Sequence, residues 1–148
     1  MNKDNFKKME YTLYNYRNLE IKVKNIEIDI NNLENDITIK AISYEERTGT
    51  TNAFNSNVEN EVIRRDKHVR EKINILKAKL KYNKDLKIKI DGALESLTDI
   101  EKSLVELRYF SREKKKWAEI GMRLGFDMDY CVKLKNRVIN KLSELIYP

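Results

Sequence analysis

Residues 117–145 read WAEIGMRLGFDMDYCVKLKNRVINKLSEL, a pattern that predicts two helices joined by a sharp turn. The first helix ends at Gly125, because glycine readily adopts the left-handed conformation that closes a helix. The second follows Asp127, whose side chain can cap it and place a carboxylate at its positive end. Its inward-facing residues recur at helical spacing: Cys131, Leu134, Val138, Leu142 and Leu145. Gly121 has no bulky side chain to hold the helices apart, so they can cross closely, as a helix-turn-helix requires.

A further helix is predicted before this pair. Thr98 and Glu101 form a capping box at its start, since each side chain can bond the backbone N–H of the other residue. Its apolar residues are Leu104, Leu107, Tyr109 and Phe110. A basic segment, residues 111–116, comes next, and Trp117 after it is expected to be buried. Residues 97–148 are therefore predicted to form a helix-turn-helix DNA-binding domain.

Residues 1–96 have the pattern of two long helices with a loop near residues 43–60. In each helix, apolar residues recur at steps of four and three, or seven, which is the heptad spacing of a coiled coil. The first series is Leu19, Val23, Ile26, Ile30, Leu33 and Ile37, which Tyr16 and Met9 extend backward, and the second is Val62, Val69, Ile73, Leu76 and Leu80. The loop is rich in small polar residues that favour turns. The alternative to a coiled coil is that each helix packs against its own domain.

The two long helices differ in the sign of their charges. The first carries Glu20, Glu27, Asp29, Glu34 and Asp36, whereas the second carries Arg64, Arg65, Lys67, Arg70, Lys72, Lys77, Lys79, Lys81 and Lys84. Opposite charges beside the apolar seams favour helices that fold back on each other. We therefore expect an all-α protein: a long antiparallel helical hairpin, similar to a coiled coil, followed by the helix-turn-helix domain. Because two narrow seams need more cover than one hairpin gives, the hairpin is also expected to form a homodimer.

The composition argues against several other classes of protein. The chain has 148 residues, a net charge of +6 and a pI near 9.2, which is compatible with a polyanionic partner. Its single cysteine, Cys131, cannot form an internal disulfide, and with the single histidine, His68, it gives no zinc-ligand set or Cys–His nucleophile. There is no glycine-rich phosphate loop, no secretory signal, and no apolar run near the ~20 residues that span a bilayer. We expect a cytoplasmic protein that is not an enzyme, needs no metal or cofactor, and does not contact membranes.

Five short segments of the C-terminal domain resemble region 4 of sigma-70 factors. They are LTDIE (97–101), VELRYF (105–110), WAEIG (117–121), RLG (123–125) and RVINKL (137–142). The whole chain resembles phage late-gene transcriptional regulators of the ArpU/RinA type, which join a helical N-terminal region to such a C-terminus. This resemblance implies a sequence-specific activator of phage late genes for packaging and morphogenesis. Double-stranded DNA is then the expected partner, with RNA polymerase as a further candidate.

The resemblance also implies which residues face the bases. By position these are Met128, Asp129 and Lys133, where sigma factors typically hold Arg, Glu and Gln. Only Asp129 keeps the chemical character, as an acceptor from cytosine N4. Met128 cannot hydrogen-bond guanine, so we expect a site different from the −35 promoter element.

Further side chains project from the recognition helix or the basic segment before it. Asn136 is expected to be another base reader. The expected phosphate contacts are Arg112, Lys114, Lys115, Lys116, Tyr130 and Arg137. The alternative for the basic run is a solvated charged surface with no partner.

Two other functions fit the same pattern. A small terminase subunit also joins a helix-turn-helix to a helical hairpin, but it assembles into a ring, so the oligomeric state separates it from a regulator. A sigma-like factor would bind RNA polymerase through the hairpin. It would also need an aromatic-rich segment to melt promoter DNA, and the sequence has none.

Overall fold

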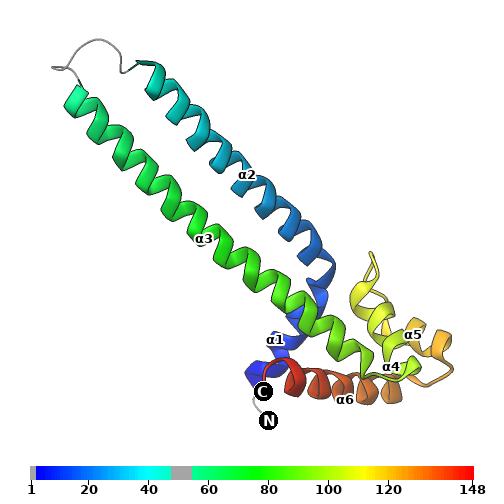
Figure 1. Ribbon diagram of the computed structural model, residues 1–148. Helices are drawn as coiled ribbons and strands as arrows, with labels where there is room; N and C mark the ends of the chain where they lie inside the picture. The colour runs from blue at the N-terminus through cyan, green and yellow to red at the C-terminus, as the bar shows by residue number, and fades with distance from the viewer. Residues whose placement is uncertain (1–2, 48–54) are drawn as a thin grey trace. The chain divides into compact units, whose positions relative to one another are not determined.

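The computed structural model describes the backbone of residues 3–47 and 55–148 and the side chains of residues 3–37 and 59–148. All regular secondary structure in these residues is helical, so the predicted all-α class is confirmed. In chain order the elements are α1 (Lys3–Tyr14), α2 (Tyr16–Arg47), α3 (Asn55–Glu95), α4 (Asp99–Val105), the π-helical turn η1 (Glu106–Phe110), α5 (Trp117–Leu124) and α6 (Met128–Ile146) (Figure 1).

The chain divides into two compact units, which we call the head and the arm. The head comprises Met1–Glu20 and Asp85–Pro148, and the arm comprises Ile21–Lys84. The head thus combines α1 with the end of α3 and with α4 to α6. This division differs from the predicted boundary between residues 96 and 97, because α1 packs into the head rather than along the arm.

The core of the head gathers apolar side chains from both ends of the chain. Its buried members are Met9, Leu13, Leu19, Ile90, Ala93, Leu97, Val105, Tyr109, Val138, Ile139, Leu142 and Ile146. Burying one Leu or Ile side chain contributes about 1.5–3 kcal/mol, so this cluster is the main source of the head's stability. Because four of its members belong to α6, the core fixes the C-terminal half of that helix.

The predicted single N-terminal helix is interrupted at Asn15, between α1 and α2. The Asn15 side-chain amide donates to the carbonyl oxygen of Tyr11 at 2.8 Å, a local bond of the kind with which Asn competes with helical backbone. The interruption separates Met9 from the arm, so the prediction that Met9 extends the arm's seam is wrong. Tyr16 also belongs to the head, where its hydroxyl donates to Asp91 and its ring stacks on Phe110 at 4.6 Å.

In the arm, α2 and α3 run antiparallel and lie side by side (Figure 1). Lys84 Nζ lies 2.9 Å from Glu27 Oε1, and Lys77 Nζ lies 3.2 Å from Glu34 Oε1. Seven residues forward in α2 therefore correspond to seven residues backward in α3. The opposite charges expected beside the seams do pair across the arm.

The seam between these helices is narrow and thinly covered. Ile30 and Ile73 are buried, each 6% exposed. The remaining predicted seam residues of the arm are only half-buried: Val23, Ile26, Leu33, Ile37, Val62, Val69, Leu76 and Leu80. The heptad pattern thus identified the facing positions, but the arm has no fully enclosed core among its described side chains.

The predicted loop near residues 43–60 is shorter than expected. The helix α2 continues to Arg47, since residues 43–47 contain no glycine or proline, and α3 already begins at Asn55. Asn and Ser at 55 and 56 are residue types that suit a helix start. The remainder of the predicted loop, residues 48–54, lies outside the described residues.

Candidate nucleic-acid interface

The helix α4 begins with the predicted capping box. The backbone N–H of Glu101 donates to Thr98 Oγ1 at 3.3 Å, and the N–H of Thr98 donates to Glu101 Oε1 at 3.0 Å. Two backbone donors that would otherwise lack partners are satisfied by these side chains. The prediction for this helix start is confirmed.

A three-residue turn, Gly125 to Asp127, joins α5 to α6. Gly125 has a φ of 77°, the left-handed conformation predicted for it. Asp127 caps α6, since its Oδ1 accepts from the N–H of Tyr130 at 2.7 Å. Both predictions for the turn are confirmed, and the turn places the start of α6 directly after α5.

Gly121 is required by a close approach of this turn. A Cβ atom added at this position would lie 2.5 Å from the carbonyl oxygen of Phe126, closer than real Cβ contacts allow. The N–H of Phe126 also donates to the carbonyl oxygen of Gly121 at 2.9 Å. The prediction of a small residue is confirmed, although the nearest neighbour is the backbone of the turn rather than a side chain of α6.

The inward face of α6 differs from the prediction at its end. Cys131, Leu134, Val138 and Leu142 are buried as expected. Leu145 is 53% exposed, so its assignment to the inward face is wrong, and Ile139 and Ile146 are buried instead. The reason is that α1 packs against the C-terminal half of α6, which makes the buried face there wider than a single stripe.

The outward face of α6 presents the predicted base readers. Met128, Asp129, Lys133, Asn136 and Arg137 are all exposed. Positions 129, 133 and 136 follow a spacing of four and three residues, so these side chains share one strip of the helix. The structure therefore brings the predicted base readers together at the N-terminal half of α6, with Met128 beside them in the first turn.

Tyr130 and Arg137 lie together on an adjacent strip of α6. The guanidinium carbon of Arg137 is 5.9 Å from the centre of the Tyr130 ring, and this ring packs at 4.7 Å from that of Phe126. With Thr98, Ile100, Glu101 and Leu134, these residues line a shallow depression of about 280 Å³. The two predicted phosphate contacts of α6 thus flank the strip of predicted base readers on the side of α4.

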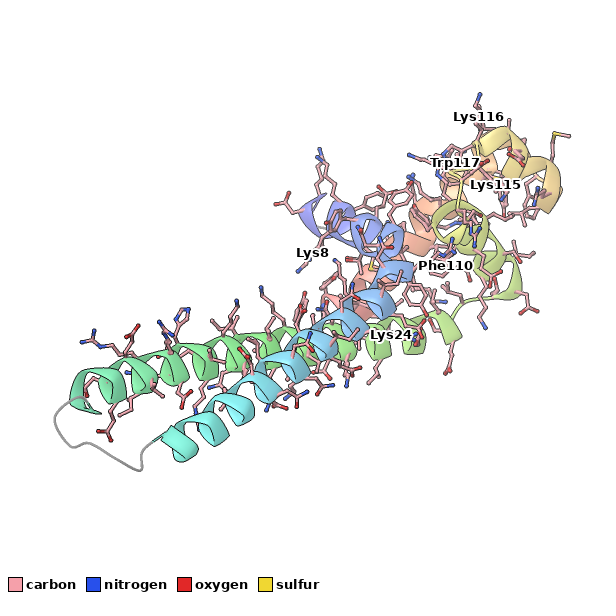
Figure 2. All side chains as sticks on the ribbon, turned by 90° about the horizontal axis from the view of Figure 1, so that it is seen from above. Lys8, Lys24, Phe110, Lys115, Lys116 and Trp117 are labelled. Atoms are coloured by element: carbon pink, nitrogen blue, oxygen red, sulfur yellow. The ribbon has the colours of Figure 1, made fainter. Side chains whose placement is uncertain are left out.

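The basic segment before α5 is not uniform. Arg112, Lys114 and Lys116 are exposed, and Figure 2 shows Lys116 extending away from the ribbon. Lys115 is half-buried, because its ammonium donates to Ser111 Oγ at 3.2 Å and its carbonyl oxygen accepts from Arg108 at 2.6 Å. Three of the four predicted cations of this segment are therefore displayed, whereas Lys115 helps to hold the loop.

Trp117 is only half-buried, so the expectation that it lies in the core is wrong. Its ring is covered by cations: the guanidinium carbon of Arg108 lies 4.4 Å from the ring centre, and Lys135 Nζ lies 5.9 Å from it. An aromatic face attracts such cations electrostatically. Trp117 thus links the start of α5 to η1 and to α6.

A polar cluster that the sequence did not reveal ties α1 to these elements. Glu10 Oε1 accepts from the Tyr109 hydroxyl at 2.8 Å and lies 3.2 Å from Lys135 Nζ. Burial raises the pKa of Tyr109, and the hydrogen bond to Glu10 raises it further, so the phenol stays a donor. Lys135 also lies 5.3 Å from the ring of Phe6. No local pattern connects positions 10, 109 and 135, so the sequence offers no signal for this cluster.

With this geometry established, the chain can be compared with known proteins. Residues 6–144 match the protein family described as "Protein of unknown function (DUF722)". The chain belongs to the DUF722 family. The match includes the arm, α1 from residue 6 onward and the outward strip of α6, so all of these are part of the DUF722 domain. No curated protein and no solved structure matches the chain.

Three exposed cations of the described head residues lie close to α5 or on α6 and have no carboxylate partner. In residues 3–37 and 59–148, Arg112, Lys116 and Lys133 form no ion pair, whereas Arg123 pairs with Glu119 at 3.3 Å. Unpaired exposed cations keep their full attraction for an anion. These three cations lie in the same part of the head as the strip of predicted base readers.

The single cysteine of the chain, Cys131, lies in the head. Cys131 is fully buried, and this burial raises the pKa of its thiol, with a further rise from the Asp127 carboxylate. Among the described side chains, no group of three or more His, Cys, Asp or Glu residues is placed to hold a metal ion. None of the described helices has the length and apolar character that crossing a membrane requires.

Proposed function

We propose that this DUF722 protein is a sequence-specific DNA-binding transcriptional regulator whose head inserts α6 into the major groove. The observation that carries the proposal is the exposed strip of Asp129, Lys133 and Asn136 on the first half of α6. It follows a three-residue turn from α5, as the recognition helix of a helix-turn-helix does. The major groove admits an α-helix and presents a distinct pattern of donors and acceptors for each base pair.

The chemistry of the strip suits base recognition. Asp129 can accept from cytosine N4, Lys133 can donate to guanine O6 and N7, and Asn136 can bond adenine at N6 and N7. Met128 offers an apolar contact for a thymine methyl group. If α6 enters the groove by its N-terminal end, its first turns lie deepest. The strip, which is in these turns, would then face the bases.

Phosphate contacts would fix the register of this helix. The exposed cations Arg112, Lys114 and Lys116 precede α5, and Arg137 with Tyr130 lies beside the base-reading strip. Phosphate contacts of this kind supply most of the affinity and make it dependent on salt. The segment before α5 and the outer side of α6 would then hold the two backbones of one groove.

The arm supports a dimeric regulator. Its seam is half-buried, and it has exposed isoleucines, among them Ile21, Ile28 and Ile75. A second copy of the chain would cover this apolar surface. Two heads joined in this way would read two half-sites about one helical turn of DNA apart. The resemblance to ArpU/RinA-type regulators supports activation of phage late genes in the bacterial cytoplasm, with RNA polymerase as a further partner.

Binding selection on randomised duplex DNA tests the proposal. The wild-type chain should enrich one motif, and Lys133→Ala should cost about 1–3 kcal/mol on it and relax preference at one position. Arg137→Ala should lower affinity without changing the motif, and Lys89→Ala, an exposed lysine of α3 in the head, should change neither. A wild-type chain that enriches no motif would contradict the proposal, and light scattering on the same sample should show a dimer.

A further inference from the structure

The N-terminal helix α1 has an outward strip that combines a cation with exposed aromatic rings. Lys7 is exposed, Tyr11 is 69% exposed and Tyr14 is 38% exposed. These three residues, which we call the α1 strip, follow one another at steps of four and three and so share one side of the helix. The opposite side holds Met9 and Leu13 in the core of the head. The core therefore fixes the direction in which the strip points.

The α1 strip is continuous with the basic segment before α5. Lys114 Nζ lies 5.2 Å from the centre of the Tyr14 ring. Arg17, exposed just after α1, donates to the carbonyl oxygen of Phe110 at 3.0 Å, immediately before that segment. The cations proposed to hold phosphates are thus extended by Tyr14, Tyr11 and Lys7 along α1.

The polarity of α1 favours an anionic partner for this strip. Glu10 lies between Tyr11 and the core and is directed inward, to Tyr109 and Lys135. Lys8 is outside the strip, since its ammonium lies 4.1 Å from the ring centre of Tyr147 (Figure 2). The strip thus presents an ammonium group and two phenol hydroxyls, and the exposed Asp4 continues the same side of the helix toward its N-terminus. Lysine and tyrosine side chains are both common donors to DNA phosphates.

We infer that the α1 strip is a second part of the DNA-binding surface, along which the phosphate backbone lies outside the site read by α6. This inference rests on the proposed function. From Lys7 to Tyr14 the helix rises about 10 Å, which corresponds to roughly three base pairs of duplex. The strip thus extends the protected DNA beyond the half-site by about that length. It gives affinity without sequence preference, because phosphates carry no base identity.

The experiment compares two matched double variants of the full chain. Lys7→Ala with Tyr11→Ala removes the two most N-terminal residues of the strip, and Lys81→Ala with Tyr82→Ala removes an exposed Lys and Tyr from the arm. The probe is a labelled duplex of about 30 base pairs that the wild-type chain selects from a randomised pool. All four side chains are exposed, so both variants should melt like the wild type. Lys7→Gln, which keeps most of the side chain, serves as a second strip variant.

Affinity is measured over a salt series. Each lost phosphate contact reduces the slope of log K against log salt by about 0.9. The strip variant loses one charged contact, Lys7, because the Tyr11 hydroxyl is neutral and displaces no counterion. Its affinity should therefore fall about threefold less than that of the wild type between 50 and 200 mM salt. The arm variant should keep the wild-type slope. Trimming the duplex outside the motif, one base pair at a time, should weaken wild-type binding but cost the strip variant no further affinity.

The outcomes separate this inference from the proposed function. The strip is no part of the DNA surface if its variant keeps the wild-type salt slope and the wild-type response to trimming. The proposed function still stands in that case if Lys114→Ala with Lys116→Ala lowers the salt slope. If the wild-type chain selects no duplex at all, the proposed function itself fails. A strip variant that shows both expected changes establishes the extended surface.

Discussion

The head and the arm both consist of amphipathic helices, but they bury their apolar residues in different ways. The head collects side chains from helices that are far apart in sequence, and Met9, Leu13 and Leu142 are completely buried there. The arm packs two helices along one seam, in which most residues stay half-exposed. The two regions therefore have similar helix periodicity, but several helices meet in the head and only two meet in the arm. A region where several helices converge can fix a surface rigidly, and a two-helix arm needs further cover.

The largest expected difference is between two leucines of the N-terminal segment. Leu13→Ala should destabilise the protein by about 2–5 kcal/mol, because it leaves a cavity in the enclosed core of the head. Leu33→Ala, in the half-buried seam of the arm, should cost about 1–2 kcal/mol, since less apolar surface is lost. Urea denaturation of both variants measures the difference. Equal losses would show that α1 belongs with the arm, as the sequence pattern first indicated.

The next comparison uses two glycines in helices of the head. Gly121→Ala should cost about 1–3 kcal/mol, because its Cβ would overlap the carbonyl oxygen of Phe126 and push the turn before α6. Gly92→Ala should instead stabilise α3 by about 0.5–1 kcal/mol, since nothing lies within 4 Å of its Cβ and alanine is the better helix former. Thermal melting distinguishes the expected loss of stability at Gly121 from the expected gain at Gly92. If both substitutions stabilise, the turn is not as close to α5 as described.

Local features of this chain were predictable from the sequence, because each depends on residues that are neighbours in the chain. The capping pair Thr98 and Glu101, the left-handed Gly125 and the cap at Asp127 are of this kind. The exposure of Asp129, Lys133 and Asn136 is also of this kind, since the period of α6 defines its outward side. Helical periodicity also identified the facing sides of α2 and α3.

Features that depend on distant residues were not predictable. The heptad seam continues backward through position 9, so nothing in the pattern indicated that Asn15 would end α1 and release it to the head. Leu145 and Ile146 are both apolar at the end of α6, and only the contact with α1 decides which is buried. The cluster of Glu10, Tyr109 and Lys135 joins three segments that no spacing rule connects.

That cluster gives a smaller expected effect than Leu13→Ala in the core of the head. Glu10→Gln should cost about 1.5–3 kcal/mol, the range for hydrogen bonds to charged groups, because Lys135 and Tyr109 both lose a charged acceptor in a largely buried place. Since Lys135 lies on α6, affinity for DNA should fall as well. Chemical denaturation and DNA titration measure the two effects. A variant with native stability would show that the cluster does not hold α1 against α6.

The smallest expected effect concerns the ion pairs of the arm. Glu27 and Lys84 lie 2.9 Å apart, but their side chains are 44% and 50% exposed, so water and salt screen the attraction. A double-mutant cycle of Glu27→Gln and Lys84→Gln should give a coupling of about 0.2–1 kcal/mol, and this should shrink as salt is raised. Exchanging the charges with Glu27→Lys and Lys84→Glu preserves the attraction and should restore native melting. Each single reversal places like charges together and should lower the melting temperature. A coupling well above this range, unaffected by salt, would mean that the pair is shielded from solvent, as it would be if a second copy covered this side of the arm.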